Sequence, residues 1–117
     1  MMEFYRGQII DVNLPHIGGS IQSGERPCVI IGNNTGNYYS PILIVIPLTS
    51  STTKTKIPTH MWVEANDENG LEVNSMALAE QIMTITKTMV IKERGSIKVS
   101  ELEELDEKIK ISLALNK

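Results

Sequence analysis

Short runs of aliphatic and β-branched residues, separated by polar turn signals, dominate the first four fifths of the chain. Runs of this length and composition favour β-strands over short buried helices. Short connections between many strands predict a curled antiparallel sheet or small barrel. The expected strands cover residues 8–12, 26–32, 42–48, 61–63, 75–79, 82–86 and 93–97.

Two polar segments interrupt this pattern. Residues 33–41 are dense in Asn, Gly, Ser and Pro, which tolerate turn geometry. Residues 68–70, Glu-Asn-Gly, are a turn signal of the same kind. Both segments are expected to be turns that join neighbouring strands.

The end of the chain has helical rather than strand periodicity. Ser100 followed by Glu103 predicts a capping box, and acidic residues crowd the first turn, where the helix dipole favours them. Apolar residues then recur at helical spacing: Leu102, Leu105, Ile109 and Leu113. We expect an amphipathic helix over about 100–115, docked on the sheet, which makes the fold mainly β with α (α+β).

The composition fits one globular domain over residues 1–117, with 41% hydrophobic and 21% charged residues. The single cysteine, Cys28, excludes an internal disulfide framework, and its apolar surroundings favour a buried, inert thiol over a reactive one. Residues 1–6 lack the apolar region of a signal peptide. No apolar run is long enough to span a membrane. A cytoplasmic protein is expected.

The net charge of −3 argues against nonspecific binding of nucleic acid. However, acidic residues concentrate in the second half of the chain, so a local basic site remains compatible with the average. Lys54 and Lys56 are candidates to attract phosphates, although a solvated face explains them nearly as well.

The candidate chemistry lies where two expected strands end. A polar loop, residues 19–25, leads to Arg26 and Pro27, and the run at 42–48 ends at Thr49. If these strands are neighbours, a guanidinium and a hydroxyl converge without a histidine or metal ligand beside them. That pair suits chemistry on a phosphodiester, because a guanidinium can contact two phosphoryl oxygens. The alternative is that Arg26 merely pairs with a surface carboxylate.

Several other polar and aromatic residues allow more than one interpretation. His16 and His60 could form the acid–base pair of a ribonuclease, but His60 at a strand entrance is expected to pack and hydrogen-bond. Tyr38 and Tyr39 could stack on bases or pack in a turn. Trp62 belongs to the core or to a dimer interface. No clustered acids or histidine motif predicts a metal site.

An ordered set of segments resembles the MazF/PemK (Kid) toxins. The set runs in the family's order over nearly the whole chain, from residue 6 to 115, and single pieces of it would be weak signals. The matching segments are Arg6-Gly7, Gly19-Ser20-x-Gln22-x-Gly24-x-Arg26-Pro27, Thr35-Gly36-Asn37 with Ser40-Pro41, the strand end at Thr49, Lys56-Ile57-Pro58-Thr59-His60, Glu80-Gln81-Ile82-Met83-Thr84-Ile85 and Ile111-Ser112-Leu113-Ala114-Leu115.

The resemblance implies an SH3-like barrel with helices, of the CcdB/MazF type, that forms a homodimer. It also implies a sequence-specific, metal-independent endoribonuclease without a cofactor, the toxin of a type II toxin-antitoxin system that a cognate antitoxin inhibits. Arg26 and Thr49 match the family's catalytic arginine and hydroxyl. The residues expected to contact single-stranded RNA (mRNA) are Gly19, Ser20, Gln22, Ser50, Lys54, Lys56 and Gln81.

The sequence also departs from the family pattern, at His16-Ile17-Gly18, Ile21, Glu25, 50–53 and 65–71. These differences leave the RNA sequence that is recognised open. A non-enzymatic, gyrase-inhibiting toxin of the CcdB type is the alternative function, since it uses the same architecture. A small interaction module with a decayed site is a third reading. Retention of both Arg26 and Thr49 favours the nuclease.

Overall fold

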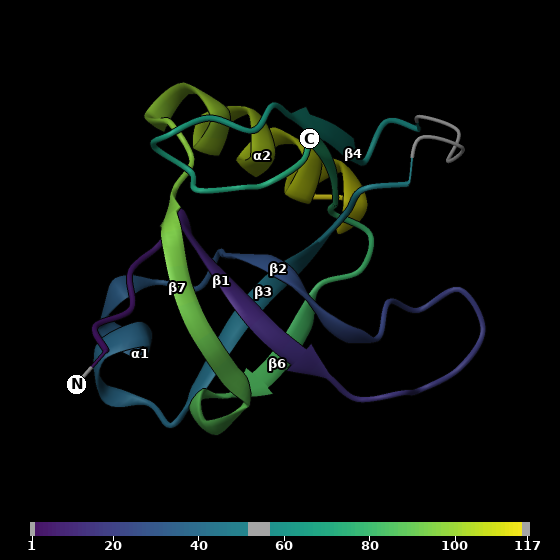
Figure 1. The fold of residues 1–117 in the computed structure, drawn as a ribbon. Helices are drawn as coiled ribbons and strands as arrows, with labels where there is room; N and C mark the ends of the chain where they lie inside the picture. Colours follow the sequence, from purple (N-terminus) through teal and green to yellow (C-terminus); the bar gives the residue numbers. More distant parts are fainter. Residues whose placement is uncertain (1, 52–56, 116–117) are drawn as a thin grey trace.

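Apolar strands build most of the structure, a computed structural model that describes residues 2–51 and 57–115. The predicted strands and C-terminal helix follow one another in the expected order, with one short α-helix and one 3-10 turn added among the described residues (Figure 1). The strands are β1 (Gln8–Leu14), β2 (Gly24–Ile30), β3 (Ile42–Thr49), β4 (His60–Val63), β5 (Ser75–Leu78), β6 (Met83–Thr86) and β7 (Val90–Ser96); the helices are α1 (Asn34–Tyr39), a 3-10 turn η1 (Lys87–Met89) and α2 (Val99–Ser112).

The strands within the described residues form one antiparallel sheet in the order β4-β5-β3-β2-β1-β7, with β6 paired to β3. β3 holds this sheet together because it has three partners. Residues 42–45 pair with β6, residues 45–47 with β2 and residues 48–49 with β5. Serving three partners along one strand curls the sheet around an interior (Figure 1). The predicted mainly-β fold with a C-terminal helix is confirmed.

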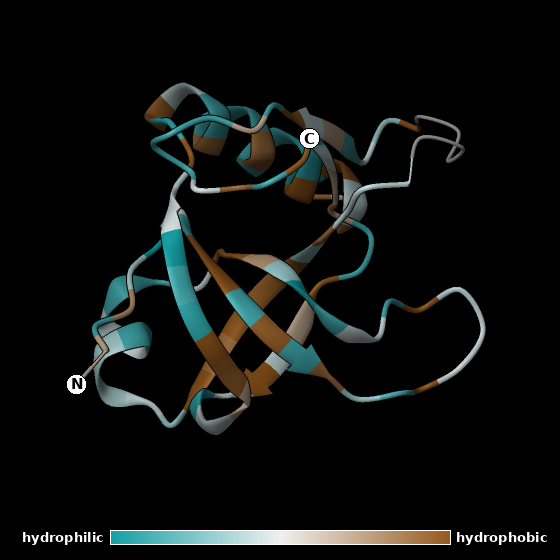
Figure 2. Cartoon of the chain, in the orientation of Figure 1, coloured by the Kyte–Doolittle hydropathy of each residue, from teal (hydrophilic) through white to brown (hydrophobic). Residues whose placement is uncertain are grey.

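Both faces of the central strands are buried, which explains their unbroken apolar runs. Ile9 packs into a cluster between the sheet and α2, whereas its neighbour Ile10 faces a second cluster inside the curl. Figure 2 shows brown, hydrophobic segments on β1 and β3, interrupted on β1 by teal ones, and a hydrophilic upper half on the outer strand β7. The two clusters fix which strand ends lie together.

The C-terminal helix is confirmed, but its start differs from the prediction. α2 begins at Val99, and the carboxylate of Glu101 accepts a hydrogen bond of 2.9 Å from the backbone N–H of Lys98. The predicted capping box of Ser100 and Glu103 is therefore wrong. The sequence offers glutamates at several positions of the first turn, and the docking of the helix selects Glu101.

The end of this helix also differs. Leu105 is fully buried and Leu102 and Ile109 pack against the same cluster, as predicted, but Leu113 is 52% exposed. The helix stops at Ser112 because Ala114 adopts a left-handed conformation, with φ of 58°. The N–H of Leu115 then bonds the carbonyl of Lys110, at 2.8 Å, in a Schellman-type ending.

The segment 33–41 is not only a turn, as predicted, because it contains α1. The side chain of Asn33 caps this helix by accepting the N–H of Gly36 at 2.8 Å. The buried side chain of Asn37 donates to the carbonyl of Gly32, also at 2.8 Å. Asparagines that favour turns in isolation here serve as a cap and an internal brace.

None of the helices in the described residues is long and apolar enough to cross a membrane.

Candidate functional site

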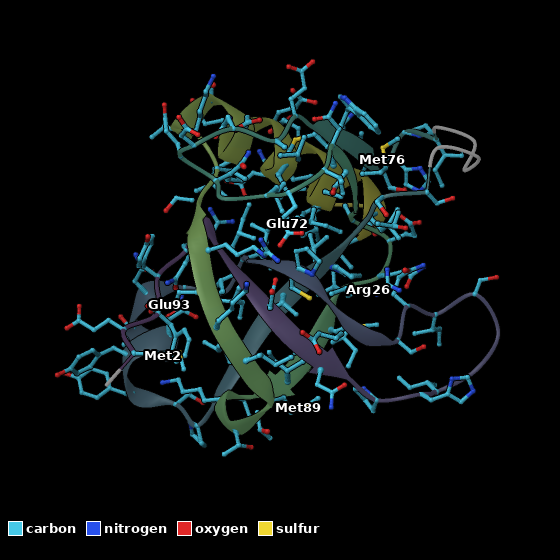
Figure 3. The ribbon with its side chains drawn as sticks, in the orientation of Figure 1. Met2, Arg26, Glu72, Met76, Met89 and Glu93 are labelled. Atoms are coloured by element: carbon cyan, nitrogen blue, oxygen red, sulfur yellow. The ribbon has the colours of Figure 1, made fainter. Side chains whose placement is uncertain are left out.

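The register of β2 and β3 brings the two predicted catalytic residues to one end of the sheet. Cys28 lies opposite Pro47, and Val29 lies opposite Ile46. Continuing this register by two positions on each strand sets Arg26 against Thr49, where the two strands separate. Figure 3 shows Arg26 beside the base of the long loop between β1 and β2. The condition set by the sequence, that these two strands are neighbours, is confirmed.

Arg26 is held by its own loop rather than by a carboxylate. Its Nε donates to the carbonyl oxygen of Ser23 at 2.9 Å, and the side chain is half-buried. Among the described residues, Arg26 takes part in no ion pair. The nearby acid Asp11 is instead paired with Arg94, with 2.6 Å between Oδ1 and Nε. The alternative of a surface ion pair is therefore wrong for this part of the chain.

Thr49 ends β3 and is almost buried. Its Oγ1 accepts a hydrogen bond of 3.3 Å from the backbone N–H of Ser51, and 6% of the residue is exposed. Ser50, between them, is exposed. Of the other residues predicted to contact RNA here, Lys54 and Lys56 lie outside the described residues.

The loop between β1 and β2 carries the remaining predicted contacts. Gly19 and Ser20 are exposed, and Gly19 has a φ of +59°, which glycine adopts without strain. Gln81, after β5, joins this loop to the body: its Oε1 accepts the N–H of Gln22 at 2.9 Å, and its Nε2 donates to the carbonyl of Ser20 at 3.0 Å. The structure thus brings together Ser20, Gln22 and Gln81.

A cavity of about 330 Å³ lies between this loop and the segment that follows β5. On the loop side its lining is apolar, with Pro15, Ile17 and Ile21, and on the body side it includes Ile82 and Met83. The loop is therefore not packed against the body along its whole length.

The contacts around Glu80 were not predicted from the sequence. His60 is buried, as expected, and its Nε2 lies 2.8 Å from Oε2 of Glu80, while Oγ1 of Thr59 donates to Oε1 at 2.9 Å. Burial alone would raise the pKa of Glu80, but hydrogen bonds from His60, the backbone and Thr59 outweigh it and lower that pKa. The segment Pro58-Thr59-His60 can be read in the sequence, but its hydrogen-bond partner Glu80 lies twenty residues further on, so no local pattern links the two.

His16 does not share this environment, since it is exposed in the loop before Gly18. The structure thus gives His60 a carboxylate partner, and the predicted packing of His60 is confirmed over the histidine-pair alternative.

The other residues singled out have structural settings. Burial raises the pKa of the Cys28 thiol to about 12, which confirms the expected inert cysteine. Tyr38 and Tyr39 are 71% and 78% exposed on α1, so neither packs in a turn. Their rings lie edge to face, with 4.7 Å between the ring centroids. Trp62 is 38% exposed and is not a core residue.

Within residues 2–51 and 57–115, no three side chains of His, Cys, Asp or Glu are grouped so that they could hold a metal ion.

Comparison with known proteins identifies the family. The model of the PemK-like, MazF-like toxins of type II toxin-antitoxin systems matches residues 5–113. The chain belongs to this family. It is 40% identical over 111 residues to "Endoribonuclease MazF" of Staphylococcus epidermidis, an alignment that covers 95% of this chain and 92% of that protein.

Solved structures share the PemK/MazF-like fold at lower identity. MazF of Deinococcus radiodurans superimposes with a TM-score of 0.83 at 17% identity and covers 97% of this chain and 99% of its own. An endoribonuclease from a mycobacterial species, solved with its cognate antitoxin, gives a TM-score of 0.78 at 21% identity and covers 97% of both chains. At these identities the likeness establishes the fold.

Proposed function

We propose that this chain is a sequence-specific endoribonuclease, an mRNA interferase that acts as the toxin of a type II toxin-antitoxin system. The observation that carries the proposal is the antiparallel register of β2 and β3, which when continued sets Arg26 opposite Thr49, in a chain of the PemK/MazF-like family. A relative with 40% identity named as an endoribonuclease supports the same reading.

The proposed reaction uses the nucleophile that RNA already contains. The 2′-oxygen attacks the adjacent phosphorus, the bond from phosphorus to the 5′-oxygen breaks, and the products are a 2′,3′-cyclic phosphate and a 5′-hydroxyl. The proton lost by the 2′-hydroxyl is balanced by the one that the 5′-oxygen gains. The protein then has two tasks: to hold the reacting atoms in line and to stabilise the charge on the phosphoryl oxygens.

Arg26 suits the second task. One of its donors is fixed to Ser23, which orients the planar group, and the terminal amino groups have no carboxylate partner among the described residues. We assign Arg26 the stabilisation of phosphoryl charge, because an arginine stays protonated in proteins and transfers protons poorly. Thr49 supplies a hydroxyl to the same phosphate. The residues proposed to contact the RNA around it are Gly19, Ser20, Gln22, Ser50, Lys54 and Lys56, whereas the amide of Gln81, which the sequence pointed to as a further contact, is bonded to the backbone of Ser20 and Gln22.

The partners proposed for this domain are single-stranded mRNA, a cognate antitoxin and a second copy of the chain. The antitoxin is supported by the mycobacterial relative, which was solved in complex with its own. A homodimer is favoured because two-fold pairing is the commonest way to cover exposed strand edges. We place the protein in the cytoplasm, where mRNA is available, and propose no metal or other cofactor.

The test is cleavage of RNA in the presence of EDTA. The purified protein should cut single-stranded RNA and leave the two ends described above, while DNA of the same sequence remains intact because it lacks the 2′-hydroxyl. Sequencing of RNA 5′ ends after brief induction would give the recognised motif. Cleavage that disappears in EDTA and returns with a divalent ion would contradict the proposed mechanism.

The CcdB-type alternative makes a different prediction with the same samples. A gyrase inhibitor would leave RNA intact and block DNA supercoiling in a purified gyrase assay. The Arg26 and Thr49 pair gives no reason for that activity, so the nuclease is favoured.

A further inference from the structure

The loop of residues 15–23 reaches away from the sheet, yet it carries the group that orients Arg26 (Figure 1). The carbonyl of Ser23, at the end of this loop, accepts the bond from Nε of Arg26 at 2.9 Å. A shift of Ser23 would therefore turn or release the guanidinium.

Apolar packing does little to fix this loop. A cavity of about 330 Å³ separates its side chains Pro15, Ile17 and Ile21 from the segment after β5, and Ile17 and Ile21 are 63% and 42% exposed. Gly18 and Gly19 both have positive φ, at +125° and +59°, which glycine adopts freely because it has no Cβ. A Cβ built at either position would touch no other atom within 4 Å, so side-chain packing does not fix the backbone here.

Gln81 supplies the missing constraint. It uses both ends of its side-chain amide on the loop backbone, accepting from Gln22 at 2.9 Å and donating to Ser20 at 3.0 Å. Two bonds to residues 20 and 22 fix both the position and the direction of the chain one residue before Ser23.

The base of Gln81 is itself anchored. Its backbone N–H bonds the carbonyl of Leu78 at 2.9 Å, and the preceding Glu80 is held by Thr59 and His60 at the start of β4. The N–H of Ala79 adds a bond of 3.0 Å to the carbonyl of Thr59. The turn that presents Gln81 is therefore tied to the sheet by several bonds, and the loop is tied to that turn.

We propose that Gln81 is a positioning residue: with the anchored Glu80 turn, it holds the loop of residues 18–23 so that Ser23 orients the guanidinium of Arg26. This inference rests on the proposed nuclease function for its kinetic consequence only. It replaces the direct RNA contact expected from the sequence for Gln81, because in the RNA-free protein both ends of the amide are already bonded to the loop.

The experiment compares Gln81→Met with the wild type and with Gln8→Met. Methionine preserves the length of the side chain but removes both hydrogen bonds. Gln8 is the matched control, since its amide also makes two bonds, to the N–H of Tyr5 and to Glu93, both at 3.2 Å, at the far end of β1. Hydrogen exchange of the Gln22 amide and of Nε–H of Arg26 is measured by NMR on RNA-free protein, and kcat and KM are measured on a short oligoribonucleotide.

In Gln81→Met the Gln22 amide and the Arg26 Nε–H should each exchange about tenfold faster, the value expected when one hydrogen bond is lost. The kcat should fall about 10- to 100-fold with KM changed less than threefold, because a displaced catalytic group lowers the rate more than the binding. Gln8→Met should leave the exchange at both loop groups and the kcat near their wild-type values.

Unchanged exchange at Gln22 in Gln81→Met would overturn the inference, and so would a rise in KM with unaltered kcat, which indicates direct RNA contact. If Gln81→Met does not fold, Gln81→Glu is tested instead. Its carboxylate can still accept the hydrogen bond from the Gln22 N–H and should keep that amide protected from exchange. Loss of that protection in Gln81→Glu would also overturn the inference. If the Gln22 amide and the Arg26 Nε–H exchange slowly in the wild type and faster in Gln81→Met, but the wild type cuts no RNA, the result would count against the proposed function and not against the loop contact.

Discussion

At the scale of single residues, Arg26 shows how a side chain can be oriented without being neutralised. A carbonyl acceptor, Ser23, fixes the plane of the guanidinium but brings no opposing charge. A carboxylate in the same place would compete with a phosphate for the remaining donors. Asp11, the acid on the neighbouring strand, is occupied by Arg94. The positive charge of Arg26 is thus left for a ligand.

Substitution at this pair should separate its two contributions. Arg26→Ala should lower kcat by at least about 100-fold, the scale set by loss of one preorganised donor, while the fold stays intact because the side chain is only half-buried. Arg26→Lys should recover little, since an ammonium cannot reproduce the guanidinium fork. Thr49→Val should be severely impaired and Thr49→Ser much less so.

The measurement is single-turnover cleavage of an oligoribonucleotide, with circular dichroism as the check on folding. Thr88→Val, at an exposed threonine in η1, is the matched control for Thr49→Val. Wild-type rates in Arg26→Ala would show that the site has been assigned to the wrong residue.

At the scale of elements, β7 lies so close to the turn before Leu71 that only glycine fits. A Cβ on Gly95 would stand 2.1 Å from the carbonyl oxygen of Glu68 and 3.0 Å from Asn69, both backbone atoms that cannot give way cheaply. The neighbouring Arg94 donates hydrogen bonds to the carboxylate of Asp11 on β1, at 2.6 Å, and to the carbonyl of Gly70 in the turn, at 2.9 Å. These contacts join β7 to both β1 and the turn.

Gly95→Ala should therefore destabilise the fold by about 1–3 kcal/mol or more, the usual range for overpacking. Gly36→Ala is the matched control: the nearest atom to its Cβ is 3.5 Å away, and it lies in α1, where alanine is favoured over glycine by about 0.5–1 kcal/mol. Urea unfolding followed by circular dichroism gives both values. Equal stability of the two variants would contradict the close approach of β7.

The Glu80 anchor gives a prediction of pH dependence. The folded state lowers the pKa of Glu80 below its ordinary value of 4.5, so its contribution is present above that value and is lost as the pH falls through the lowered pKa. Glu80→Gln should thus be less stable than the wild type at pH 7, and the difference should shrink below about pH 4.

Urea unfolding at several pH values tests this, with the exposed Glu103→Gln as the control that should follow the wild type throughout. A difference between Glu80→Gln and the wild type that grows on acidification would contradict the assigned sign.

At the scale of the whole molecule, the site lies at one end of two interior strands, β2 and β3, and several large apolar side chains remain exposed around the structure. Trp62 on β4 is one of them, together with Ile42 and Ile44 on β3. Large apolar side chains that stay exposed on a small domain are candidates for burial in an interface. This exposure agrees with the proposal that the working unit is a homodimer.

Light scattering of the purified protein should give the mass of a dimer, and dissociation on dilution should change the fluorescence of Trp62. An acidic antitoxin segment that covers Arg26 should compete with RNA, and its inhibition should weaken as salt rises because the contact is between charges. Full activity in a monomer would refute the dimer, and binding of inhibitor together with intact RNA would refute the competition.

Local patterns in the sequence were enough to predict the strands, the C-terminal helix and the residues of the candidate site. Apolar runs predicted the strands because most positions of the central strands are buried, and the spacing of Leu102, Leu105 and Ile109 predicted a helix because these side chains recur on one face. The ends of two such runs, at Arg26 and Thr49, marked the candidate site. The family resemblance rested on the same ordered segments.

What only the tertiary structure decided are the contacts between distant parts of the chain. Asp11 and Arg94 are 83 positions apart, and Gln81 reaches Ser20 across 61. No local periodicity encodes these pairs, because they exist only once the curl of β3 has brought the strand ends and loops together. The sequence by itself determined the elements and the reactive side chains, whereas the folded chain decided which groups orient them.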